Sequence, residues 1–179
     1  MTDSRQIPSA QVVMELMLHE AAANGDDKRI EELQVYLKRG KISVNQADVE
    51  WGNRTPLHCA AERGNPRCVR LLLESGANPY ARMVGGWTPA HCAAEAGHCD
   101  ILQTLIDFQT PVDIKDDNGD RPRHIAEIYG QNECVTLLKR AEKHPVGQYS
   151  FKSKRLWGTV QSFTEDIQES VRQKTIEKK

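Results

Sequence analysis

Apolar residues recur at helical spacing in paired segments along most of the chain. The segment P-L-H-C-A-A-E-R is followed, after G-N-P, by R-C-V-R-L-L-L-E-S, and later come C-D-I-L-Q-T-L-I-D and E-C-V-T-L-L-K-R-A. Apolar positions three and four residues apart predict helices that each bury one face. The pattern therefore predicts pairs of helices joined by short turns.

These helix pairs return with a fixed period. T-P-L-H-C-A-A-E-R-G begins at Thr55, T-P-A-H-C-A-A-E-A-G at Thr88 and R-P-R-H-I-A-E-I-Y-G at Arg121, so the copies are 33 residues apart. A looser copy, L-H-E-A-A-A-N-G, begins at Leu18, and its histidine lies 39 residues before the next one. The first unit therefore carries about six extra residues, about three before Gly40 and about three after it. A period of this length predicts a stack of similar units.

Each repeat has residues that typically start a helix and residues that typically end one. Thr55 and Thr88 are N-cap residues, and a proline follows each at the first helical position. Gly64, Gly97 and Gly130 supply the left-handed turn after the short helix. Two departures stand out. Gln109 replaces the glycine that ends the second helix of the preceding unit at Gly76. Arg121 replaces the capping threonine in the fourth unit, where Asp120 is the alternative cap, and we expect this unit to fray first.

Turn-rich segments connect the units. N-P-Y-A-R-M-V-G-G-W and V-D-I-K-D-D-N-G-D predict hairpin loops that project from the helices, and Asn118-Gly119 is a tight-turn signal.

The unit resembles the ankyrin repeat, a β-turn plus two helices with the T-P-L-H-x-A signature, from about Met14 to His144. The resemblance implies an all-α ankyrin-repeat solenoid over residues 13–144, with units of about 14–49, 50–82, 83–115 and 116–144. Residues 1–12 are predicted to form a flexible N-terminus, and residues 145–179 a basic amphipathic tail. In this family the repeat histidines brace neighbouring loops, which is the role implied for His58, His91 and His124.

Ankyrin repeats bind proteins on a concave face built from hairpin tips and the first helix of each unit. Counting from the repeat histidines places this face at Trp51, Arg54, Glu62, Arg63, Arg82, Val84, Trp87, Glu95, Asp117 and Tyr129, together with Lys115, Asp120, Ala96 and Ile128. Tryptophan, tyrosine and arginine dominate binding hot spots. The alternative is that a hairpin tryptophan covers its neighbouring loop and that the charges are simply solvated.

Charge and composition narrow the function class. The net charge is −1, so no overall field favours nucleic acid or a membrane. No apolar run is long enough to span a bilayer, and the first ten residues lack the apolar core of a signal peptide. We therefore expect an intracellular, cytoplasmic location, with a nuclear, ciliary or cytoskeletal one as alternatives. In such a reducing compartment the five cysteines fit free thiols better than a disulfide framework.

Neighbouring histidines and cysteines raise the question of a metal site or a nucleophile. Pairs such as His58-Cys59 and His91-Cys92 lack the C-x-x-C spacing of zinc sites, and adjacent helical side chains diverge. Cys59 and Cys92 share a repeat position with Ile125, which indicates small apolar core residues. We therefore predict no catalytic residue, no metal and no cofactor, and hence no enzyme.

The basic tail has its own pattern. Residues 145–179 hold seven Lys or Arg and four Asp or Glu, and an apolar stripe runs through Leu156, Val160, Phe163, Ile167 and Val171 beside Trp157. This stripe predicts an amphipathic helix. The helix has three possible sites: the repeats themselves, a groove in another protein, or, less favoured, a membrane surface.

The function expected from all of this is protein–protein interaction as an adaptor or scaffold, by a chain that is a monomer on its own. The alternative is a structural component of a cytoskeletal or ciliary assembly, anchored by the tail. Neither hypothesis identifies the partner.

Overall fold

The computed structural model describes residues 9–143. The helices among them are α1 (Ala10–Asn24), α2 (Asp27–Lys38), α3 (Pro56–Arg63), α4 (Pro66–Glu74), the short 3-10 turn η1 (Val84–Gly86), α5 (Pro89–Ala96), α6 (Cys99–Asp107), α7 (Pro122–Ile128) and α8 (Asn132–Lys143). We refer to the pairs α1–α2, α3–α4, α5–α6 and α7–α8 as units 1 to 4.

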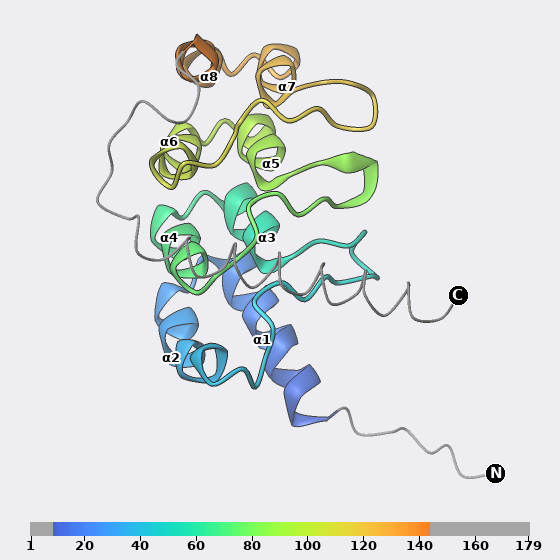
Figure 1. Cartoon of the computed structure of the whole chain (residues 1–179), viewed down its shortest axis with the longest axis vertical. Coiled ribbons are helices and arrows are strands. Elements are labelled where there is room, and N and C mark those ends of the chain that lie inside the picture. Colours follow the sequence, from blue (N-terminus) through green and yellow to red (C-terminus); the bar gives the residue numbers. More distant parts are fainter. Residues whose placement is uncertain (1–8, 144–179) are drawn as a thin grey trace, which may run out of the picture. The chain divides into compact units, whose positions relative to one another are not determined.

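The four units stack in sequence order. The first helices α1, α3, α5 and α7 contact one another in succession, and so do the second helices α2, α4, α6 and α8. Figure 1 shows these two columns of helices, with the connecting loops projecting to one side. The predicted all-α repeat solenoid is confirmed.

Helix starts and lengths follow the sequence signals. Ser9 caps α1, because its hydroxyl accepts a hydrogen bond from the Val12 N–H at 3.4 Å. The helix therefore begins at Ala10, three residues before the predicted domain boundary. The helix α2 has 12 residues, whereas α4 and α6 have nine each. Three of the extra residues of unit 1 thus lie before Gly40, as predicted, and the structure shows that they lengthen its second helix.

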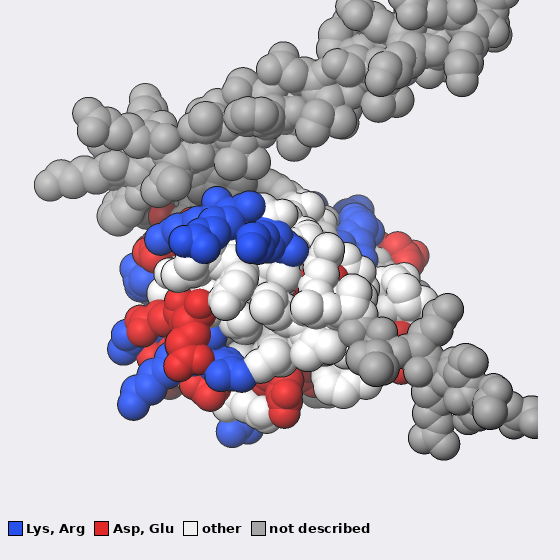
Figure 2. Space-filling view, turned by 90° about the horizontal axis from the view of Figure 1, so that it is seen from below, with Lys and Arg blue, Asp and Glu red and all other residues white. Residues whose placement is uncertain are grey.

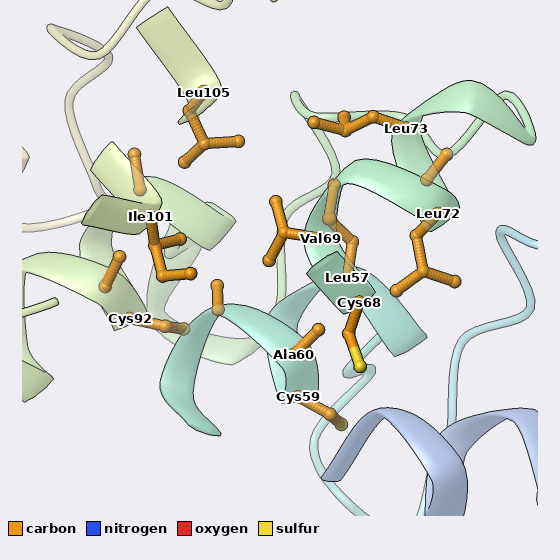
Figure 3. Packing of buried hydrophobic residues seen from close by; sticks show 14 of the residues in the cluster. Leu57, Cys59, Ala60, Cys68, Val69, Leu72, Leu73, Cys92, Ile101 and Leu105 are labelled. Carbon is orange, nitrogen blue, oxygen red and sulfur yellow. The ribbon is translucent and has the colours of Figure 1, made fainter. Parts of the chain in front are cut away.

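The core runs between successive units rather than within one of them. Figure 3 shows side chains of α3 to α6 turned toward a shared interior, with Val69 and Ile101 pointing toward one another from consecutive units. Both are fully buried, and so are Leu57 and Leu102. Because each unit buries its apolar face on its neighbours, no unit has a complete core of its own.

The first unit presents a polar outer surface. Cys59 and Cys68 of unit 2 are buried at 3% and 0% exposure, yet the equivalent positions 39 residues earlier hold Glu20 and Arg29, which are exposed. Figure 2, seen from the end of the stack that carries α1 and α2, shows acidic and basic side chains together on one side and uncharged residues beside them. Unit 1 therefore carries charges in place of core residues on the side where residues 9–143 place no other unit.

Left-handed backbone residues end the short helices. Gly64, Gly97 and Gly130 have φ of 82°, 78° and 72°, as their spacing predicts. Gly76 has φ of 87° after α4, and Gln109 adopts φ of 59° at the equivalent place after α6. Unit 3 therefore has the same left-handed turn as unit 2, although a residue with a Cβ, such as Gln109, disfavours this backbone conformation.

Candidate protein-binding surface

Buried histidines hold each projecting loop in place. The ring nitrogen Nδ1 of His58 accepts from the Thr55 N–H at 3.2 Å, and Nε2 lies 3.1 Å from the Trp87 carbonyl of the next unit. His91 does the same with Thr88 at 3.1 Å and Asp120 at 3.2 Å. This geometry assigns the proton to Nε2, which donates to the carbonyl. The predicted bracing role of His58 and His91 is confirmed.

Burial keeps these rings neutral. Desolvation lowers the pKa of His58 from 6.5 to about 4, and the nearby positive charge of Arg54 acts in the same direction. Burial also lowers the pKa of His91. Only a neutral ring can accept a hydrogen bond at Nδ1 while it donates one at Nε2. The lowered pKa and the hydrogen-bond geometry therefore both indicate a neutral ring.

The loops are also joined directly to one another. The Val84 N–H donates to the Gly52 carbonyl at 2.8 Å, and the Asp117 N–H donates to the Gly85 carbonyl at 3.1 Å. The two bonds are related by the 33-residue repeat. Hairpins of units 2 to 4 therefore form a bonded row, which fixes the spacing of the side chains at their tips.

The tips of the first two hairpins carry exposed apolar side chains. Trp51 is 56% exposed, Val84 64% and Val49 78%. An added Cβ on Gly52 would lie 3.4 Å from Val84, so these tips are close together. Trp51 and Val84 were predicted from the repeat register. Val49 was missed because it lies in the inserted residues of unit 1, and its nearness to Trp51 was the available signal.

Ion pairs link several of the predicted charges. The Arg54 guanidinium pairs with the Glu62 carboxylate, which joins the base of a hairpin to α3. The guanidinium of Arg82 lies 3.5 Å from Asp117 and donates to the Lys115 carbonyl at 2.7 Å. The structure thus brings the four predicted residues together in two ion pairs, each of which joins two segments.

The first helices add a second apolar area. Ile128 and Tyr129 at the end of α7 are 68% and 52% exposed. A hydrogen bond to Glu95, with its negative charge, raises the pKa of the Tyr129 phenol. Arg63 is exposed at the equivalent place on α3. Charged side chains at the ends of α3 and α5 are therefore followed along this row by apolar side chains at the end of α7.

Comparison with known proteins decides the family. A family model described as "Ankyrin repeats (3 copies)" matches residues 18–114 and 82–149. The chain belongs to the ankyrin-repeat family. Ankyrin repeats generally serve as protein-interaction modules, and the surface described above is of the kind that such modules use.

Relatives of this ankyrin chain have varied names. Human "Protein phosphatase 1 regulatory subunit 27" is 33% identical over 110 residues, which is 62% of this chain and 70% of that protein. Human "Transient receptor potential cation channel subfamily A member 1" is 30% identical over 129 residues, 72% of this chain. "Glycerophosphocholine phosphodiesterase GDE1" of Candida albicans is 36% identical over 107 residues, 59% of this chain. The matched regions of the last two span only 11% and 9% of those proteins.

Trp87 has a different environment from Trp51. Its indole N–H donates to Asp116 at 3.1 Å, its ring stacks on His91 at 6.0 Å, and it packs half-buried against the core of the ankyrin stack. Partial burial raises the pKa of Asp116, but hydrogen bonds from Asp120, Asn118 and Trp87 outweigh it and hold that pKa below its usual value. Trp87 therefore contributes to the loop itself, and any partner would meet only its exposed edge.

Three cysteines are unreactive core residues, as their repeat positions predict. Burial raises the pKa of Cys59 and Cys68 to about 11, and that of Cys92 to about 12. A thiol must be ionised to act as a nucleophile or metal ligand, so these groups suit neither role. Among residues 9–143, no three His, Cys, Asp or Glu side chains are grouped to hold a metal ion, and no helix is long and apolar enough to cross a membrane.

The expectation of free thiols is wrong for the other two cysteines. Cys99 of α6 and Cys134 of α8 form a disulfide, with their Cα atoms 5.0 Å apart. Their separation of 35 residues is two more than the repeat, so they occupy different repeat positions and the periodicity does not pair them. Their contact depends on how the second helices stack.

The predicted tail surface lies outside the described residues. Leu156, Trp157, Val160, Phe163 and Ile167 all belong to residues 144–179, and their role stays a prediction.

Proposed function

We propose that this chain is an adaptor or scaffold that holds a protein partner on the hairpin tips and the exposed ends of the first helices. One observation supports this most: the loops are braced by buried histidines and joined to each other, yet their tips expose Val49, Trp51 and Val84. A rigid scaffold that presents exposed aromatic and aliphatic groups loses little conformational freedom on binding.

The charged groups of the same surface would add specificity. Arg63 is exposed beside the Arg54–Glu62 pair, and Glu95 adjoins Tyr129 on the next helices. Polar groups around an apolar centre orient a partner and exclude unsuitable ones. We therefore expect a partner segment with an apolar residue facing Trp51 and polar residues facing the helices.

Protein phosphatase 1 is a defined first probe. The relative named as a regulatory subunit of that phosphatase matches this chain over most of its own length. Binding of purified phosphatase is measured by calorimetry with the wild-type chain and with Trp51→Ala/Val84→Ser. If this surface binds the phosphatase, the double variant loses roughly 30-fold or more in affinity, about 2 kcal/mol.

The control variant is Val35→Ser/Tyr80→Ala. These side chains are 49% and 47% exposed, and Val35 lies on α2 in the other column of helices. The control should bind as the wild type does. Equal weakening by both variants, with the fold intact by circular dichroism, would place the binding site elsewhere. If the phosphatase does not bind, affinity purification repeated with the same two variants separates specific partners from background.

The cytoskeletal alternative predicts a different outcome. If the basic tail anchors the chain in a filament, the full chain co-sediments with microtubules and a chain without residues 145–179 does not. The Trp51→Ala/Val84→Ser variant would then still co-sediment.

A further inference from the structure

Two cysteines at the boundary between units 3 and 4 differ from the other three. Cys99 is partly exposed at the first position of α6, whereas Cys134 is fully buried in α8. Their Cα atoms, 5.0 Å apart, lie within the distance range of disulfides. We propose that this pair is a reversible redox lock, which joins the second helices of units 3 and 4 when oxidised and releases them when reduced.

The reduced form is compatible with the same fold. Position 134 is equivalent to Cys68 in unit 2 and Ile101 in unit 3, both of which are fully buried. A free Cys134 thiol therefore fills an ordinary apolar position of the repeat. Breaking the bond leaves no cavity and no buried charge, so both redox forms can stack.

The position of Cys99 makes the bond reachable. Cys99 is the first residue of α6 and is partly exposed, so small thiols can reach its sulfur. The thiols of Cys59, Cys68 and Cys92 are buried and hard to ionise. Exchange with small thiols should therefore begin at Cys99 and involve this pair alone.

Glutathione disulfide is a suitable oxidant for the reaction. The Cys99 thiolate attacks one glutathione sulfur, forms a mixed disulfide and expels the other half as a thiolate. Cys134, held beside Cys99 by the stacked second helices, then attacks the Cys99 sulfur and expels the second glutathione, and its thiol proton passes to that departing glutathione thiolate. Two protein thiols are oxidised, one glutathione disulfide is reduced to two glutathione thiols, and two protons pass from the cysteines to them. Reduction reverses these steps, with glutathione attacking Cys99.

The consequence is greatest in unit 4. The described part of the chain places no further unit beyond α7 and α8, so these helices are held by unit 3 and by each other. The disulfide closes a loop that contains all of α6 and α7 and the first residues of α8, which limits the freedom of the opened state. Oxidation should therefore slow the opening of unit 4.

The experiment uses the full chain in glutathione buffers ranging from fully reduced to fully oxidised. Free thiols are trapped with N-ethylmaleimide, and peptides are identified by mass spectrometry without reduction. We expect a single cross-link, Cys99–Cys134, that forms with glutathione disulfide and disappears with excess glutathione in the absence of denaturant. No cross-link, a different pair, or a cross-link that resists reduction until the chain is unfolded would overturn the proposal.

Thermal unfolding supplies a second readout. Oxidised wild type should melt roughly 5 to 10 °C above reduced wild type. Cys99→Ser should melt at one temperature in both buffers, while Cys92→Ala, a buried cysteine outside the pair, should keep the redox difference. A redox difference that persists in Cys99→Ser would refute the assignment, whatever partner the hairpin surface binds.

Discussion

Units 3 and 4 have the same arrangement of two helices but carry different side chains on the outer face of the first helix. In α5, Ala90 and Ala94 are 1% and 0% exposed because α7 packs against this helix. The equivalent residues of α7, 33 positions later, are Arg123 and Glu127, which pair with each other at 2.9 Å. The equivalent helix thus carries alanine where a following unit covers it, and charge where residues 9–143 place no following unit.

The charged face of unit 4 extends onto its second helix. Arg123 also pairs with Glu142 at 3.1 Å, and Lys139 pairs with Glu127 at 3.3 Å. Lys139 is equivalent to the buried Leu73 of unit 2. Partly exposed ion pairs contribute little to stability, so this network keeps the end of the stack soluble more than it strengthens it.

The repeat histidines show the same difference. His58 and His91 are fully buried and reach the next loop, whereas the side chain of His124 is 38% exposed and lies 3.3 Å from Asp120 of its own unit. Within residues 9–143, therefore, His124 contacts its own unit and braces no neighbouring loop, unlike the role that the family resemblance implied. A repeat residue acquires its buried role from the following unit, and the terminal copy keeps the residue without the environment.

Replacing the histidines should give the largest difference between the two kinds of unit. His58→Ala removes the hydrogen bonds at both ring nitrogens and takes this partner from the Thr55 N–H, the Thr55 hydroxyl and the Trp87 carbonyl, so we expect a loss of about 3 kcal/mol in the free energy of unfolding. His124→Ala should cost less than about 1 kcal/mol. Urea unfolding followed by circular dichroism measures both, and equal losses would contradict the comparison.

Acid should weaken the internal units selectively. The pKa of His58 is about 4 in the folded state and 6.5 in the unfolded state, so below pH 6.5 the unfolded chain binds more protons. The stability that His58 contributes is complete above pH 6.5 and is lost as the pH falls toward 4, about 2 kcal/mol of it by pH 5. His91 acts in the same direction.

The control for this effect is His58→Gln, whose amide can accept and donate without titrating. Unfolding by urea at pH 7 and pH 5 should show a smaller loss in this variant than in the wild type. An unchanged pH dependence would mean that other groups, such as carboxylates, account for the acid sensitivity.

Hydrogen exchange should rank the units directly. In the reduced chain, amides of α7 and α8 should exchange at least about tenfold faster than those of α5 and α6, a difference of about 1.4 kcal/mol in opening free energy. The reason is that, among the residues that the structure describes, only unit 3 packs against unit 4. Equal protection of units 3 and 4 in the reduced state would show that other contacts, such as the ion pairs of unit 4, make the two units equally stable.

Much of this arrangement follows from sequence periodicity. The 33-residue spacing predicts which histidines and glycines are equivalent, and the structure places them as predicted in units 2 and 3. Trp51 and Val84 are exposed where the register puts them. These features depend on local helix-capping residues and on the same contact between each pair of consecutive units. Both recur with the repeat, so the sequence pattern predicts them.

Other features depend on contacts that do not follow the period. Trp87 is half-buried because Asp116 of the next loop accepts its N–H, and nothing in the sequence around Trp87 marks that partner. The Cys99–Cys134 disulfide joins residues that are not equivalent in the repeat. Arg121 likewise gains no side-chain cap, because Asp120, the expected substitute, reaches His124 instead.

The smallest expected effect concerns the strained turn that ends the second helix of unit 3. Gln109 holds φ of 59°, a conformation that disfavours residues with a Cβ, at the position where unit 2 has Gly76. Gln109→Gly should therefore raise the free energy of unfolding by about 0.5 to 1 kcal/mol. The matched change, Gly76→Ala, should lower the free energy of unfolding by about 1 kcal/mol, because a residue with a Cβ is strained at φ of 87°. An added Cβ there would meet no atom within 4 Å, so backbone strain alone accounts for this loss. The urea midpoints of both variants measure these effects. If Gln109→Gly lowers the midpoint, the glutamine side chain makes a contact that offsets its backbone strain. Unit 3 would then lack a local weakness comparable to that expected in unit 4.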